Sequence, residues 1–126
     1  MAAGLTTLDL LDTGSVWQRL ETVGAALEDA LAPVLAEAPF PVTLVRAGSL
    51  FWLSLREGAA PRTAVTLENK ALARFAALFH AMLAQGVYLP PSAYEVCFLS
   101  ASFGEPDIAY FAAALGKSLR IAAQAS

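Results

Sequence analysis

The side chains that could do chemistry in this 126-residue chain are few and stand apart from one another. There is one histidine (His80), one cysteine (Cys97) and two lysines (Lys70 and Lys117). None of them has partners at the spacing of a catalytic triad or a metal site, so we expect no catalytic residue and no metal in this chain. The clearest candidate is Glu95, a carboxylate in the otherwise apolar run "AYEVCFL".

Two interpretations of Glu95 are open from the residues alone. A carboxylate buried on an apolar strand is costly unless a cation or hydrogen-bond donor pairs with it, which would favour a functional site. Most glutamates are exposed, however, and Glu95 could simply lie on the outer face of an edge strand. Ser92, just before it in "PPS", could hydrogen-bond near the same site, although a serine after Pro-Pro more simply caps a turn.

The remaining candidates are interpreted as structural. His80 is expected to be a packed or partly exposed histidine, because no acid or nucleophile accompanies it. Cys97 is expected to be a small buried apolar residue. Trp52 and Tyr88 could line a pocket, but packing in the core is the simpler interpretation of both. Ser49, next to Gly48, is expected to be a turn residue.

Composition excludes several classes of function. The net charge is −3 and there is no basic patch, which argues against a nucleic-acid partner. No apolar run reaches the ~18 residues of a transmembrane helix. The lone cysteine and the acidic, leaderless N-terminus favour a cytoplasmic location. Charged residues make up only 15% of the chain against a usual value of about 25%, so a second domain, a twin subunit or both should cover apolar surface.

Hydrophobic periodicity predicts the elements that would position these residues. A short helix is expected over residues 2–11. A longer helix should start at Ser15 as N-cap and carry an apolar stripe from Val16 to Leu35, with Pro33 kinking or ending it. Residues 42–46 and 49–57 read as two strands joined by a tight turn, and the second strand should be covered on both faces.

The second half continues in the same way. An exposed loop is expected from residue 57, with 57–66 as a candidate moving segment. A helix follows over 67–85, with Gly86 at its C-terminal end and an apolar stripe of Leu72, Phe75, Ala76, Phe79, Met82 and Leu83. A strand is expected over 94–100. A last helix over 104–124 should have Pro106 in its first turn. The order helix, helix, strand, strand, helix, strand, helix predicts a two-layer α+β domain with a three-stranded, mainly antiparallel sheet.

Three runs of the sequence together resemble a known family. They are "GSLFWLSL", then "RFAALFHAMLAQGVYLPPSAYEVCFLSAS", then the acidic helix start "EPDI". They look like the C-terminal small domain of glutamate-1-semialdehyde 2,1-aminomutase, a class III aminotransferase of fold type I that depends on pyridoxal phosphate (PLP). The opening "MAAGLTTLDLLD" is also similar to the family. The resemblance implies one small domain over 42–126, with 1–36 as a helical lead-in from an absent large domain.

The resemblance also implies functions for particular residues. The family moves an amino group within one substrate to give 5-aminolevulinate for tetrapyrrole synthesis, with PLP as amine carrier. Its Schiff-base lysine and phosphate-binding residues lie upstream of the part matching this chain, and Lys70 and Lys117 match nothing equivalent, so the chain alone should bind no PLP and be inactive. Glu95 matches the family glutamate in "PSxFE" that faces the active site. Ser92 and Ser49 are weaker candidates from the same match.

Two departures from the family pattern bear on the substrate. Phe103 stands where the family commonly has histidine, and "EVCF" replaces the small pair that usually follows the glutamate. Three hypotheses therefore follow. The chain is a domain of an aminomutase dimer, paired with its large domain and a twin subunit. It is a domain of another class III aminotransferase, for example one acting on β-amino acids. Or it is a stand-alone dimerisation or binding module without catalysis.

Overall fold

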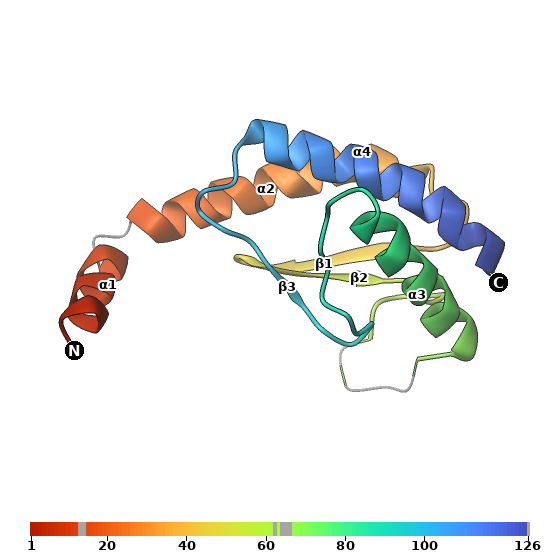
Figure 1. Ribbon diagram of the computed structural model, residues 1–126, viewed down its shortest axis with the longest axis horizontal. Helices are drawn as coiled ribbons and strands as arrows, with labels where there is room; N and C mark the ends of the chain where they lie inside the picture. Colours follow the sequence, from red (N-terminus) through yellow and green to blue (C-terminus); the bar gives the residue numbers. More distant parts are fainter. Residues whose placement is uncertain (13–14, 62, 64–66, 126) are drawn as a thin grey trace.

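The fold is a small α+β domain in two layers, as the sequence predicts (Figure 1). A computed structural model describes residues 1–12, 15–61, 63 and 67–125. The elements follow one another as α1 (Ala2–Asp12), α2 (Ser15–Ala36), β1 (Thr43–Ala47), β2 (Leu50–Ser54), α3 (Asn69–Leu83), β3 (Cys97–Phe98), α4 (Glu105–Ala122) and a 3-10 helix (Ala123–Ala125).

The sheet is antiparallel throughout, in the order β1-β2-β3. Ala47 pairs with Leu50, so the β1–β2 hairpin turns on only two residues, Gly48 and Ser49. Gly48 has φ +59°, which a two-residue hairpin with glycine in its first central position requires and which glycine adopts without steric cost. The predicted strand over 94–100 shrinks to Cys97–Phe98, because the chain turns at residues 93–94 before it reaches the sheet.

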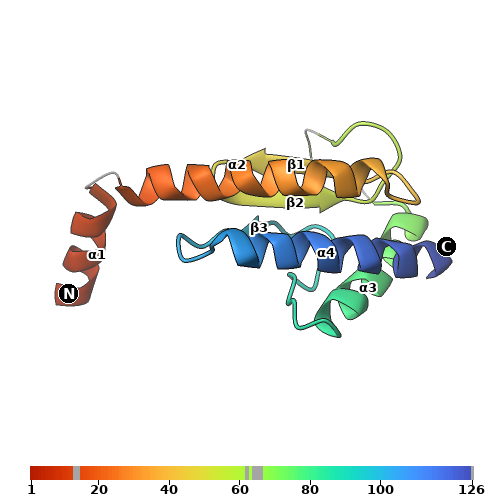
Figure 2. The same cartoon turned by 90° about the horizontal axis from the view of Figure 1, so that it is seen from above.

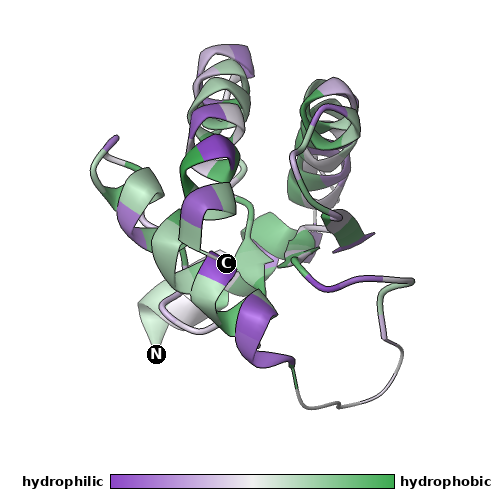
Figure 3. Ribbon diagram, turned by 90° about the vertical axis from the view of Figure 1, so that its right-hand side faces the viewer, coloured by the Kyte–Doolittle hydropathy of each residue, from purple (hydrophilic) through white to green (hydrophobic). Residues whose placement is uncertain are grey.

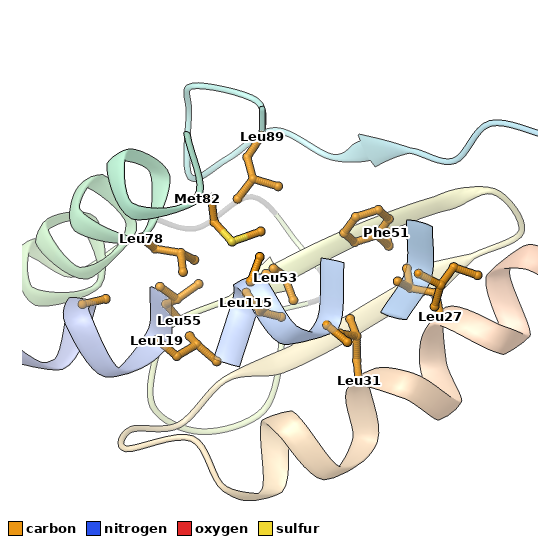
Figure 4. Packing of buried hydrophobic residues seen from close by; sticks show 14 of the residues in the cluster. Leu27, Leu31, Phe51, Leu53, Leu55, Leu78, Met82, Leu89, Leu115 and Leu119 are labelled. Atoms are coloured by element: carbon orange, nitrogen blue, oxygen red, sulfur yellow. The ribbon is translucent and has the colours of Figure 1, made fainter. Parts of the chain in front are cut away.

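Helices α2 and α4 lie side by side over one face of the sheet, and α3 packs against α4 (Figure 2). Seen along these helices, the sheet beneath them is coloured mostly hydrophobic (Figure 3). Figure 4 shows the core that joins the layers: Leu27 and Leu31 of α2 and Leu115 and Leu119 of α4 meet Phe51 and Leu53 of β2, with Leu78 and Met82 of α3 closing the end. Complementary apolar faces thus account for the layering.

The opposite face of the sheet has no helix over it among the described residues (Figure 1). On β2, Phe51 and Leu53 point into the core and are buried, whereas Leu50 and Trp52 on the other face are only half-buried. The expectation that β2 is covered on both faces is therefore only partly met.

The helices mostly follow their predicted patterns. In α2 the buried residues are Val23, Gly24, Leu27 and Leu31, on the expected stripe. The helix continues through Pro33 to Ala36, and it begins at Ser15 itself, so the N-cap position falls outside the described residues.

Helix α3 ends as predicted but is rotated from the expected stripe. Gly86 has φ +76°, and its N–H and that of Val87 donate to the carbonyls of Leu83 and Met82, a Schellman ending. Met82 of the expected stripe is fully buried, but so is Leu78, which was not on it, and the predicted Phe75 and Phe79 are only partly buried.

Helix α1 stands apart from the rest of the domain (Figure 1). It joins α2 at one end, and none of its residues is buried although Leu5 and Leu8 are large and apolar. Across the described part of the chain, no helix is both long and apolar enough to cross a membrane.

The turn at Ser92–Glu95 and the open face of the sheet

Glu95 lies in a turn, not on a strand. The turn is closed by the N–H of Glu95, which donates to the carbonyl of Ser92 at 3.1 Å. The carboxylate then folds back, and its Oε2 accepts the N–H of Ser92 at 3.1 Å. Ser92 Oγ in turn accepts the N–H of Tyr94 at 3.2 Å. Ser92 therefore has the turn-capping role expected of it, and Glu95 shares in that role.

The side chain of Glu95 is exposed, so it avoids the cost of a buried charge. Its Oε1 forms no hydrogen bond with any residue that the structure describes, which leaves that oxygen as an open acceptor. The geometry therefore holds one carboxylate oxygen in place and leaves the other exposed at the surface.

Two hydrogen bonds fix the turn, one to the open face of the sheet and one to the segment before α3. Trp52 Nε1 donates to the carbonyl of Ala93 at 2.8 Å. The hydroxyl of Tyr94 accepts the N–H of Leu67 at 2.9 Å, which links the turn to the start of the α3 segment. These contacts hold the turn beside a groove of about 530 Å³ on the open face, which is lined mainly by apolar residues: Val45, Ala47, Leu50, Phe51, Trp52, Pro61, Thr63, Leu67, Tyr94 and Val96.

The structure brings together two of the three predicted site residues. Ser92 and Glu95 share the turn, but Ser49 lies at the hairpin, where its carbonyl accepts the N–H of Leu99 at 2.8 Å. Because Phe51 is level with Cys97 in the sheet, Ser49 is level with Leu99, several residues beyond the turn. Ser49 is thus a turn residue of the hairpin.

Trp52 and Tyr88 differ from the core packing expected of them. Trp52 is half-buried in the wall of the groove, and Tyr88 is 71% exposed. The contact beside the candidate site that sequence reasoning missed is the hydrogen bond from Leu67 to Tyr94, and its only sequence signal is the tyrosine immediately before Glu95.

The other potentially reactive side chains, His80 and Cys97, do not lie at this turn. His80 is exposed on α3 with its ring against Phe79. Burial raises the pKa of the Cys97 thiol to about 11, which keeps it protonated near neutral pH. Among the described residues, no group of three or more His, Cys, Asp or Glu side chains is placed to hold a metal ion.

Comparison with known proteins identifies the relatives of this fold. No model of a protein family matches the chain. The glutamate-1-semialdehyde 2,1-aminomutase of Myxococcus xanthus is 41% identical over 121 residues, which are 95% of this chain and 28% of that protein. The chain is homologous to part of the glutamate-1-semialdehyde 2,1-aminomutases. The resemblance drawn from the sequence is thereby confirmed, and the chain spans about a quarter of the length of the aminomutases it matches.

Solved structures agree with this relationship. A transaminase with PLP bound superposes with a TM-score of 0.75 at 28% identity, covering 97% of this chain and 27% of that one. An omega-transaminase from Sphaerobacter thermophilus has a TM-score of 0.74 at 27% identity, covering 86% of this chain and 25% of its own. The α+β fold is therefore one that occurs within larger PLP-dependent transaminases.

The residues that the structure describes do not form a binding site for PLP. A PLP site needs a lysine that can reach the cofactor carbon and donors that hold its phosphate. Lys70 and Lys117 are both exposed, and neither lines the groove beside Glu95. The residues that the structure describes therefore do not by themselves supply the lysine of a PLP site beside Glu95.

Proposed function

We propose that this chain is the C-terminal small domain of a PLP-dependent glutamate-1-semialdehyde 2,1-aminomutase, which moves an amino group within one substrate to give 5-aminolevulinate for tetrapyrrole synthesis in the cytoplasm. The observation that carries the proposal is the 41% identity to an aminomutase over 95% of this chain. The transaminase structures match at only 27–28% identity, so an aminomutase is favoured over another transaminase.

In this proposal the domain closes over an active site that the rest of the enzyme builds. Glu95 presents its open Oε1 toward that site while Ser92 holds Oε2, so the carboxylate is pre-oriented to accept a hydrogen bond from the substrate amine. This is a positioning role, and Ser92 supports it through the backbone of the turn. Ser49, at the hairpin, has no part in it.

The partners of the domain are the large PLP-binding domain and a twin subunit. Two features support this. The open face of the sheet exposes an apolar groove, and α1 carries Leu5 and Leu8 with no core residue against them. Apolar surface of this kind normally marks an interface. We assign α1 and α2 to the lead-in from the large domain and residues 42–126 to the small domain.

The isolated chain should neither bind PLP nor catalyse amino transfer. With added PLP, we expect no yellow absorbance band that borohydride bleaches and fixes to protein. A band trapped on Lys70 or Lys117 would contradict this part of the proposal.

A chimera tests the proposal directly. This chain would replace the corresponding part of the Myxococcus xanthus aminomutase, and the product would be assayed with glutamate-1-semialdehyde and, separately, with a β-amino acid donor. We expect turnover of the first substrate only. Turnover of the β-amino acid alone would favour the other aminotransferase class, and a chimera that folds and binds PLP without either activity would favour a non-catalytic module.

The role of Glu95 is tested within the same chimera. Glu95→Gln keeps an oxygen that can accept the Ser92 N–H but removes the charge, so the turn should persist while turnover falls by about 10-fold or more. Glu105→Gln, at the exposed start of α4, is the matched control and should leave turnover unchanged. Equal turnover in the two variants would show that Glu95 has only a structural role in the turn.

A further inference from the structure

The shape of the turn at Ser92–Glu95 and its orientation depend on different hydrogen bonds. Three bonds run inside the turn, among the backbone and side-chain groups of Ser92, Tyr94 and Glu95. They fix how the carboxylate lies within the turn, and none of them reaches the sheet. The direction in which Glu95 Oε1 points relative to the sheet therefore depends on contacts that leave the turn.

Backbone pairing supplies no such contact. The ladder between β2 and β3 begins at the pair of Phe51 with Cys97, two residues after Glu95. Among the described residues, no backbone hydrogen bond joins residues 90–96 to β2. The turn is thus formed before the chain enters the sheet, and the ladder does not hold it.

Two side-chain hydrogen bonds tie the turn to the domain, and Trp52 provides the one with the firmer base. Trp52 lies on the central strand of the sheet, opposite Val45 of β1, and its Nε1 donates to the carbonyl of Ala93 at 2.8 Å. Ala93 is buried, so water is poorly placed to replace the indole as donor to that carbonyl. The second bond, from the N–H of Leu67 to the hydroxyl of Tyr94, comes from a segment outside any helix or strand.

We propose that Trp52 is a positioning residue for Glu95. Its indole N–H holds the Ala93 carbonyl and thereby fixes the direction in which the turn presents Glu95 Oε1. Under the proposed function, on which this inference rests, that oxygen accepts a hydrogen bond from the substrate amine. A misplacement of about 1 Å in such a group can lower a rate by ~100-fold, so an anchor on the central strand serves the reaction without touching the substrate.

Packing alone is the competing role for Trp52, because its ring also lines the groove on the open face. Trp52→Phe separates the two roles: it keeps an aromatic ring at this place and removes the N–H donor. Trp17→Phe is the matched control, since Trp17 is the other tryptophan of the chain and is 57% exposed on α2.

Residual dipolar couplings of backbone N–H groups test the orientation of the turn in the full chain, without any catalysis. In the unsubstituted chain, the couplings of residues 93–95 and of β2 should fit one common alignment frame. In Trp52→Phe the β2 couplings should keep that frame, whereas those of residues 93–95 should depart from it or average toward zero. Trp17→Phe should change neither set. Turn couplings that still fit the common frame in Trp52→Phe would overturn the proposal.

Hydrogen exchange of the indole N–H groups tests the bond in the unsubstituted chain and does not depend on Trp52→Phe folding. The indole N–H of Trp52 should exchange at least ~10-fold more slowly than that of Trp17, because a hydrogen-bonded donor must open before it exchanges. Equal exchange rates for the two indoles would also overturn the proposal.

A double-mutant cycle in the chimera tests whether Trp52 acts through Glu95. Trp52→Phe should lower turnover of glutamate-1-semialdehyde by about 5-fold or more, but by less than about 2-fold when Glu95→Gln is already present, since the carboxylate to be oriented is then gone. Equal losses in the two backgrounds would show that Trp52 acts by another route. A chimera without turnover, or one that Glu95→Gln leaves unchanged, would contradict the proposed function instead, and the dipolar couplings would then decide whether Trp52 orients the turn.

Discussion

Gly24 of α2 lies so close to Arg46 of β1 that a Cβ at Gly24 would stand 2.6 Å from Arg46 Nη1. It would also lie 3.0 Å from the carbonyl oxygen of Gly48, which is backbone and cannot move aside cheaply. Arg46 Nη1 bridges this point, donating to the Gly48 carbonyl at 2.9 Å and to Glu21 at 3.1 Å. The missing side chain at Gly24 therefore lets α2 dock on the hairpin and its arginine.

Gly24→Ala should destabilise the domain. Alanine is the better helix former by about 1 kcal/mol, but overpacking against Arg46 and Gly48 costs about 1–3 kcal/mol. We expect a lower midpoint of urea unfolding. Gly4→Ala, on the exposed α1 with nothing within 4 Å of the new Cβ, is the control and should be neutral or slightly stabilising. A Gly24→Ala chain as stable as that control would show that the contact relaxes freely.

The ion pair of Glu21 with Arg46 should make stability depend on pH. A hydrogen bond and charge attraction from Arg46 lower the pKa of Glu21 in the folded state. A lowered folded-state pKa means that the pair stabilises the fold above the unfolded pKa of about 4.5, and that this stabilisation is lost as the pH falls through the folded value. Glu21→Gln should thus be less stable than the parent at pH 7, and the difference should shrink toward about pH 3.

Urea is the suitable denaturant for that comparison, because guanidinium would screen the pair. Asp29→Asn is the matched control, since Asp29 lies on the same helix and has no ion pair among the described residues. A Glu21→Gln deficit that stays constant from pH 7 to pH 3 would point to a packing effect instead of the charge.

Cys97 should react slowly with iodoacetamide in the native chain. Burial raises its pKa to about 11 against about 8.5 for a free thiol, so the thiolate fraction at pH 8 falls by more than roughly 100-fold. Alkylation followed by mass spectrometry should speed up as the pH rises through about 10, and in urea it should be fast at pH 8. Equal rates in the native and unfolded chains at pH 8 would contradict the burial of this thiol.

Gln85 should contribute to the joint between α3 and α4. Its Nε2 donates to the carbonyls of Ala81 and Ala114 and to Ser118 Oγ, at 3.0, 3.3 and 2.8 Å, and Ser118 is fully buried. Gln85→Ala leaves those acceptors without this donor, so the free energy of unfolding should fall by about 1–2 kcal/mol. Gln18→Ala, exposed on α2, should change it by less than about 0.5 kcal/mol in the same thermal or urea measurement.

Much of the fold could be predicted from the sequence because its signals are local. The α2 stripe through Leu27 and Leu31, the turn at Gly48 and the Schellman ending at Gly86 each depend on residues a few positions apart. The α3 stripe was harder, because leucine, phenylalanine and alanine occur around most of that helix. Only contact with α4 and β2 selects Leu78 for the core over Phe75 and Phe79.

The candidate site was predictable in its residues but not in its geometry. The run "PPSAYE" indicated a turn followed by a strand, and the aminomutase resemblance singled out Glu95. Glu95 closes the turn by accepting the Ser92 N–H, and Ser49 lies apart at the hairpin. Both placements depend on the path of the chain from α3 to β3. Hydrogen bonds from Trp52 and to Tyr94 fix that path, and they join residues 41 and 27 positions apart.

The sequence by itself determined the element order, the α+β class and the kinship with aminomutases, because periodicity, turn residues and motif identity are properties of the chain read in order. The tertiary structure alone decided which surfaces stay open. Among the described residues, one face of the sheet stays open because α2 and α4 both pack on the other face, and helix α1 has no buried residue. Burial is a property of the whole packed chain, and no stretch of residues specifies it alone.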